Sequence, residues 1–276
     1  MCLGGGRWYN RSMPERERLY RAEGVVLSRI DFGEADRLLT VFTREFGKLE
    51  QIAKGVRRPR SRKAGHLELF TRVQLLAARG RDLDVITQVE AIETYPQLSK
   101  DLQLVGQASY ILELVKHFAV RGEVNHELYR LLVETLERLN SGDPPPIVTR
   151  YFELRLLELA GYRPELFRCG HCQVEIRPEA QFFSYIDGGV LCPNCGREQK
   201  GVRPITLAAL KVMRHYQRNP FSIASTARIR TQVHQELDHL MEGFFSYLTE
   251  HKLNSPSFMR RINQNPNTTR EEDIIA

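Results

Sequence analysis

The chain lacks long hydrophobic runs and has few cysteines. None of its apolar stretches approaches the ~18 residues that a membrane-spanning helix needs. The first residues, Met1 to Gly6, lack the apolar segment of a secretory signal peptide, so we expect a cytoplasmic protein with no membrane partner. Five cysteines among 276 residues do not suit a small secreted domain held together by disulfides.

The sequence also lacks the short motifs of several enzyme classes. It contains no G-x-x-x-x-G-K-[ST] phosphate loop and no G-x-S-x-G nucleophile elbow. The eight histidines do not fall at metal-ligand spacing. Carboxylates that lie close in sequence, such as Glu34 and Asp36, are expected to be solvated surface groups rather than an active site. We therefore expect no ATPase, nuclease or hydrolase activity and predict that the protein is not an enzyme.

Four of the cysteines stand as two C-x-x-C pairs with nineteen residues between them: Cys169 and Cys172, then Cys192 and Cys195. This spacing predicts one structural Zn²⁺ held by four thiolates. A redox dithiol, two disulfides and an iron–sulfur cluster are the alternatives. A nucleobase deaminase fits poorly, because His66-Leu67-Glu68 matches H-x-E but no proline precedes either pair. Four cysteines close the site, so we expect the metal to do no chemistry.

Positive charge is concentrated in one window of the chain. The net charge of the whole protein is +6, whereas residues 48–81 alone contain 10 basic and 2 acidic residues, a difference of +8. The segment 54–63 carries six cations and no acid, and its guanidinium groups suit bidentate contacts with phosphate. We predict a DNA-binding surface made of Lys48, Lys54, Arg57, Arg58, Arg60, Arg62, Lys63, Arg72, Arg79 and Arg81.

The pattern of the first third of the chain predicts β-strands. Apolar and polar residues alternate over 23–30, 37–43, 49–53, 67–77 and 84–92, and glycine-containing turns separate these segments. Five short strands in ~75 residues with a basic face favour an OB-type barrel. Phe42, Phe46 and Phe70 are expected to fill its core, whereas Phe32 lies in a turn and is the better candidate for stacking on a base.

After Pro96 the apolar residues recur at helical spacing. The predicted fold is therefore α+β: a five-stranded OB-type barrel followed by an α-helical domain that carries a four-cysteine zinc module, with a β-hairpin between the cysteine pairs. Lys211 and Arg214 share one helix face, and we assign them to an acidic protein partner from charge alone. The expected segments are a disordered leader (1–18), the barrel (19–96), helices (97–167), the zinc module (168–200), further helices (201–253) and a flexible tail (254–276).

The order of these features resembles one known family. The stretch from Asp31 to Thr43, then Gly47-Lys48, then the stretch from Ala53 to Ser61 with its K-G-x-R-R-x-x-S pattern, resembles the N-terminal domain of the RecO family, the bacterial recombination mediators. The cysteine quartet matches the zinc-bearing members, and the resemblance covers roughly residues 20–250.

The resemblance implies a nucleoid-associated protein that binds single- and double-stranded DNA and anneals complementary strands. It also implies action with RecR to help load RecA onto DNA coated by single-strand-binding protein (SSB), whose tail would contact the helical domain. The alternative is a zinc-ribbon scaffold or regulator that binds RNA or another protein.

Overall fold

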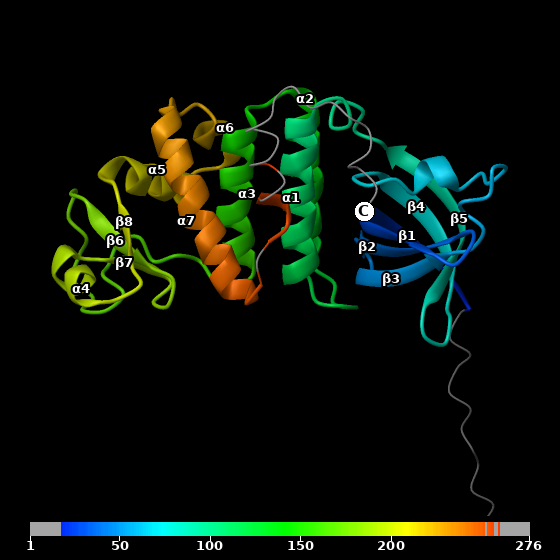
Figure 1. Cartoon of the computed structure of the whole chain (residues 1–276), viewed down its shortest axis with the longest axis horizontal. Helices are drawn as coiled ribbons and strands as arrows, with labels where there is room; N and C mark the ends of the chain where they lie inside the picture. The colour runs from blue at the N-terminus through cyan, green and yellow to red at the C-terminus, as the bar shows by residue number, and fades with distance from the viewer. Residues whose placement is uncertain (1–17, 252, 257–258, 260–276) are drawn as a thin grey trace, which may run out of the picture.

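The protein is elongated, with a β-barrel at one end, a cysteine-containing module at the other and a helical body between them (Figure 1). This computed structural model describes residues 18–251, 253–256 and 259. The expected leader therefore lies outside the described residues except for Arg18, and so does most of the expected tail. No helix among the described residues is long and apolar enough to cross a bilayer.

The N-terminal part is a closed barrel of five strands in the order β1-β2-β3-β5-β4. Its pairs are antiparallel except for a short parallel contact between β3 and β5, which closes the barrel. The strands are β1 (Leu19–Phe32), β2 (Asp36–Thr43), β3 (Gly47–Ala53), β4 (Arg72–Ala78) and β5 (Asp84–Glu93). The predicted OB-type barrel is thus confirmed.

Several strand bounds differ from the prediction. The first strand runs from Leu19 to Phe32 and so extends past both predicted ends, Glu23 and Ile30. The fourth strand begins at Arg72, so the predicted start at Leu67 was wrong. The residues before Arg72 form the short 3-10 helix η1 (Ala64–His66) and a turn that buries Leu67 and Phe70. An apolar run therefore marks burial here, but not extended backbone.

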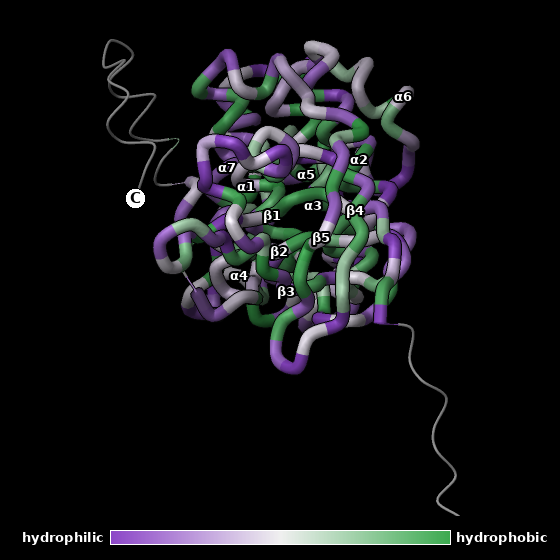
Figure 2. The backbone as a smooth tube through the Cα atoms, turned by 90° about the vertical axis from the view of Figure 1, so that its right-hand side faces the viewer, coloured by the Kyte–Doolittle hydropathy of each residue, from purple (hydrophilic) through white to green (hydrophobic). Residues whose placement is uncertain are grey.

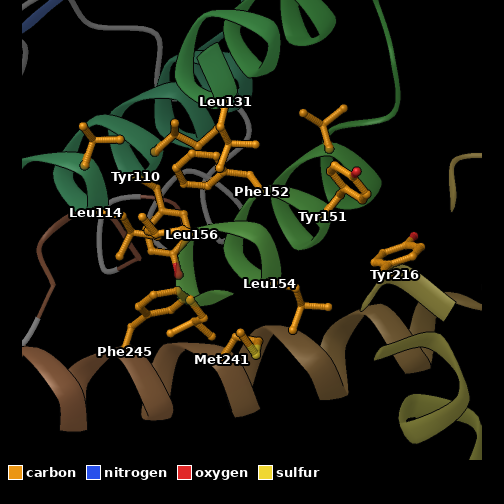
Figure 3. Close-up of a cluster of buried hydrophobic side chains, with 14 of the residues drawn as sticks. Tyr110, Leu114, Leu131, Tyr151, Phe152, Leu154, Leu156, Tyr216, Met241 and Phe245 are labelled. Atoms are coloured by element: carbon orange, nitrogen blue, oxygen red, sulfur yellow. The ribbon is translucent and has the colours of Figure 1, made fainter. Parts of the chain in front are cut away.

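The helical body contains α1 (Leu102–Phe118), α2 (His126–Ser141), α3 (Pro145–Leu159), α5 (Leu207–Arg218), α6 (Phe221–Ala224) and α7 (Thr231–Thr249). The side chains of Asp101 and Asn125 cap the N-termini of α1 and α2 by accepting from backbone N–H groups, and a left-handed Gly142 ends α2. Figure 3 shows how side chains of α1, α3 and α7 meet in one core, among them Tyr110, Leu114, Phe152, Leu156, Met241 and Phe245.

A buried charged cluster links three of these helices. Arg150 and Glu153 of α3 form an ion pair, Tyr110 of α1 donates to Glu153 Oε1 at 2.7 Å, and Arg150 also bonds Asp238 of α7. Burial raises the pKa of Glu153 to about 7, and the nearby Arg150 guanidinium only partly offsets this. Ionisation of one core carboxyl is thus coupled to helix packing.

The module at the far end contains β6 (Gln181–Ser184), β7 (Gly189–Leu191), α4 (Pro193–Glu198) and β8 (Arg203–Ile205). Strands β6 and β7 pair antiparallel, with Phe182 opposite Leu191, and β8 joins the other edge of β6. The hairpin predicted between the cysteine pairs is therefore confirmed.

The barrel packs directly against α1 and α2. Phe42 and Leu27, which point out of the barrel, belong to the same apolar cluster as the helical core. Tyr129 of α2 donates to Glu23 of β1 at 3.0 Å, next to the ion pair between Glu23 and Arg72. This junction covers one end of the outer barrel surface and leaves the other end open.

Candidate nucleic-acid interface and metal centre

The basic segment is an anchored loop that follows β3. Val56 is fully buried in the barrel core. The backbone N–H of Gly55 donates to Asp36 Oδ1 at 2.7 Å, and that of Arg57 donates to the carbonyl of Ala35 at 2.9 Å. Gly55 takes a left-handed φ of 64°, which the tight turn away from β3 requires. These contacts tie the start of the loop to the β1–β2 turn, so its cations project from a fixed base.

Four loop cations are exposed and form no ion pair or side-chain hydrogen bond with any described residue: Lys54, Arg58, Arg60 and Arg62. An unpaired surface cation keeps its full charge for an incoming anion. Four such charges within nine residues concentrate positive charge on this loop. These side chains match the predicted DNA contacts best.

The other two loop cations have partners within the protein. Arg57 Nε lies 3.1 Å from Asp31 Oδ2, and its guanidinium also donates to the carbonyl of Gly33. Lys63 Nζ donates to the backbone carbonyls of Lys54 and Ile86 at 3.0 and 3.2 Å. Burial lowers the pKa of Lys63. Its ammonium group mainly fixes the loop to β5 and is less available to a phosphate.

The remaining predicted cations lie at two other places. Lys48 Nζ donates to the carbonyl of Lys116 in α1 at 2.6 Å, and Arg72 is paired with Glu23, so both serve the barrel–helix junction.

The second place is the β4–β5 turn, which contains Arg79 and Arg81. The Arg79 guanidinium lies 4.9 Å from the centre of the Tyr20 ring. Arg81 is exposed. The sequence window is therefore divided by the fold into three surfaces.

An ion-pair network beneath the loop was missed by the sequence analysis. Arg29 and Arg37 both bind Glu68, and Arg37 Nε also lies 2.9 Å from Asp31 Oδ1. Its hydrogen bond to Arg37 lowers the pKa of Asp31 despite the opposing effect of desolvation. No local sequence pattern indicated this cluster, because Arg29 reaches the core face, opposite Leu39, only through the β-bulge between Val26 and Ser28.

The expectation that Phe42, Phe46 and Phe70 fill the barrel core was correct only for Phe46. Phe42 and Phe70 are buried, but in the apolar cluster of the helical body rather than in the barrel core. Phe46 is half-buried and packs on the barrel core beside Tyr20, with ring centres 4.9 Å apart. Phe32 is 52% exposed at the end of β1, beside the loop. Phe32 is thus the accessible aromatic of this group.

The four paired cysteines converge. The sulfurs of Cys169, Cys172, Cys192 and Cys195 all lie within 4.8 Å of one another, and the Sγ atoms of Cys172 and Cys192 are 3.8 Å apart. A tetrahedral zinc site with Zn–S bonds of about 2.3 Å places its sulfurs about 3.8 Å apart. The donor set and its dimensions therefore fit a metal ion.

The surroundings of Cys169 favour a thiolate. Burial opposes ionisation, but backbone N–H groups of Cys172, Cys192 and His171 outweigh it and lower the pKa of Cys169 to about 6. The N–H of Cys192 lies 3.4 Å from Cys169 Sγ. The two C-x-x-C turns, here called knuckles (169–172 and 192–195), thus point both sulfurs and N–H donors at one centre. This arrangement is expected of a structural metal site.

The face predicted to bind an acidic partner is partly occupied. Arg214 donates through Nε and Nη2 to the carbonyl of Leu166, at 2.8 and 2.6 Å, and lies over the Phe167 ring. Lys211 is exposed on the same helix. Arg214 therefore holds the segment that leads into the cysteine module against α5, and Lys211 has no such partner among the described residues.

Comparison with known proteins agrees with this architecture. The family model Recombination protein O N terminal matches residues 17–95, and Recombination protein O C terminal matches residues 99–257. The chain belongs to the RecO family. The first RecO match ends with the barrel, and the second spans the helical body and the cysteine module.

Individual RecO proteins support the same assignment. The DNA repair protein RecO of Roseiflexus sp. (strain RS-1) is 35% identical over 249 residues, which is 90% of this chain and 88% of that protein. The DNA repair protein RecO of Pelotomaculum thermopropionicum is 34% identical over 257 residues, covering 93% of this chain and all of that protein. Membership in the RecO family gives the chain a role in DNA repair and recombination.

Proposed function

We propose that this protein is a recombination mediator that binds single- and double-stranded DNA through the barrel loop and anneals complementary strands. With RecR it helps load RecA onto SSB-coated strands, in the cytoplasm at the nucleoid, without catalysing bond chemistry. The observation that carries the proposal is the set of four exposed, unpaired cations on a loop fixed to the barrel, in a chain of the RecO family.

The physical mechanism is neutralisation of phosphate. Each loop cation that contacts a phosphate releases condensed counterions, which favours binding without reading the base sequence. Two strands whose phosphates are neutralised repel each other less, so complementary segments meet more often. This mechanism needs only positioned charge, which the anchored loop supplies.

A strand-annealing assay tests the proposal. The variant Lys54→Ala/Arg58→Ala/Arg60→Ala/Arg62→Ala should lose most acceleration of annealing between complementary oligonucleotides, both bare and SSB-coated. A matched control removes four exposed cations of the other half: Arg177→Ala/Arg197→Ala/Lys200→Ala/Arg228→Ala. Equal losses in the two variants would show that only total charge matters, and an unaffected loop variant would remove the loop from the mechanism.

We propose one structural Zn²⁺ in the cysteine cluster, held by Cys169, Cys172, Cys192 and Cys195. A bound zinc would cross-link the two knuckles and hold the β6–β7 hairpin to its flanking segments. Metal analysis of purified protein tests this, with one zinc per chain as the expected result. Iron with visible absorbance, or no metal at all, would contradict it.

The partner contact assigned to Lys211 and Arg214 stays a prediction. Because Arg214 bonds the carbonyl of Leu166, only Lys211 offers an uncommitted charge to an acidic peptide. Lys211→Glu should weaken binding of the SSB tail if that contact lies here. Unchanged tail affinity would place the contact elsewhere on the helical body.

A further inference from the structure

The open end of the outer barrel surface is apolar, although it faces solvent. Ile30 and Phe32 of β1 are 60% and 52% exposed. Their neighbours across the sheet are also apolar, because Ile30 lies opposite Leu38, Leu38 opposite Ile52, and Ile52 opposite Val85. We propose that this row, with Phe32 beside it, is a stacking surface for the bases of single-stranded DNA. We name it the outer strip; it comprises Ile30, Phe32, Leu38, Ile52 and Val85.

The strand register shows that the outer strip points away from the barrel core. Residues directly opposite each other share one face of a sheet. Leu39 is buried in the core and lies opposite Arg29, so Ile30 and Leu38 occupy the other face. A β-bulge between Val26 and Ser28 shifts the alternation of β1 and places Ile30 and Phe32 outward.

The helical body does not cover this part of the outer surface. Farther along the same face, Phe42 is fully buried and packs against the helices, whereas Ile30 is mostly exposed. Figure 2 views the molecule from the barrel end and shows hydrophobic segments of β3 and β5 between hydrophilic loops. Three inter-strand spacings of about 4.8 Å give the row a length of about 14 Å, enough for a few bases.

Charge at the border of the outer strip identifies its occupant. The basic loop starts two residues after Ile52, at the exposed Lys54, and its backbone is bonded to the β1–β2 turn that follows Phe32. An apolar row beside unpaired cations matches a strand whose bases lie on the row while its phosphates meet Lys54 and Arg58. The bases of a duplex stay stacked inside it and make no stacking contact with the row. The outer strip therefore confers a preference for single strands.

Substitution of the two most exposed side chains tests the inference, which rests on the proposed DNA binding. Ile30→Ala/Phe32→Ala should weaken binding of a single-stranded oligothymidylate about tenfold, because the two side chains most exposed to the bases are removed. Duplex affinity and the salt dependence of single-strand binding should stay at their wild-type values. A matched control, Val120→Ala/Ile186→Ala, removes two exposed apolar side chains outside the barrel and should change neither affinity.

A fluorescence probe reports the contact directly. In a Trp8→Phe background, which removes the one native tryptophan, Phe32→Trp should lose indole emission on adding oligothymidylate but not on adding duplex. Equal effects on single strands and duplex, or no effect of Ile30→Ala/Phe32→Ala on either, would overturn the inference. If the four-cation loop variant still lost binding, the proposed function would survive that result. If neither variant lost binding, both would fail.

Discussion

Lys63 Nζ donates a hydrogen bond to the backbone carbonyl of Lys54, 3.0 Å away, and closes the basic loop on itself. A second bond to the carbonyl of Ile86 fixes this closed loop to β5. One cation of the run therefore shapes the surface on which the others are displayed. Charge counted along a sequence does not distinguish these two roles.

The two lysines should respond differently to the same substitution. Lys54→Met should reduce DNA affinity and lower the magnitude of the salt slope on single strands by about 0.7, with no change in stability. Lys63→Met should instead lower the free energy of unfolding by on the order of 1 kcal/mol, because two carbonyls lose their partner. Salt titrations and denaturant unfolding of both variants measure this difference. Identical behaviour of the two variants would contradict the assigned roles.

Removing the metal should loosen the cysteine module before the barrel. The module contains short strands and a six-residue helix, so the metal would supply much of its stability. Amide hydrogen exchange after chelation should show lost protection in 168–200 and unchanged protection in the barrel strands.

DNA binding distinguishes a distant structural metal from a functional one. Figure 1 places the cysteine module and the barrel at opposite ends of the molecule. Binding by chelated protein should therefore keep its wild-type affinity. Loss of DNA binding with the barrel intact would place the metal in the DNA site.

Stability should depend on pH through Glu153. Its pKa of about 7 in the folded protein exceeds the ordinary 4.5, so between these values the folded state binds more protons than the unfolded state. The contribution of this group to stability therefore falls as pH rises through that window, by on the order of 3 kcal/mol. Glu153→Gln should remove this slope, so the variant gains stability relative to wild type from pH 4.5 to pH 8.

Paired unfolding curves at several pH values measure the Glu153 effect. The difference between wild type and Glu153→Gln cancels the titration of all other groups that the substitution leaves undisturbed. Glu134→Gln, at a partly exposed pair with Arg138, serves as the control and should give a constant difference. A constant difference for Glu153→Gln as well would show that Arg150 keeps the carboxylate ionised throughout.

A glycine at the barrel–helix junction should tolerate no side chain. Gly47 has a φ of 65°, and a Cβ on it would lie 1.9 Å from the carbonyl oxygen of Glu123. Gly47→Ala should cost about 2–4 kcal/mol in unfolding free energy, because backbone strain adds to the clash. Gly122→Ala, with a φ of 72° and open space around it, should cost only about 1 kcal/mol. Equal costs would remove the close approach as an explanation.

Much of the fold follows from local pattern. Alternation indicated all five barrel strands, and the spacing of the cysteine pairs indicated both the metal cluster and the hairpin between them. These features depend on residues near each other in the chain. The start of β4 was missed because Leu67 is buried by a turn, and burial alone does not specify backbone conformation.

The division of the basic residues could not be predicted in the same way. Whether Arg72 faces solvent or Glu23 depends on strand pairing between residues 49 positions apart. The outer strip likewise depends on the bulge in β1, which moves Ile30 from the core face to the outer face. Neither feature has a signal within a window of ten residues, since both arise from register.

The salt dependence of DNA binding tests the central claim most directly. The measurement compares the slope of log affinity against log salt for oligothymidylate, in wild type and in Lys54→Ala/Arg58→Ala/Arg60→Ala/Arg62→Ala. If each of the four cations neutralises one phosphate, the substitution should reduce the magnitude of the slope by about 3 and lower the affinity at every salt concentration. A variant that keeps both the wild-type affinity and the wild-type slope would contradict the assignment of the barrel loop to DNA.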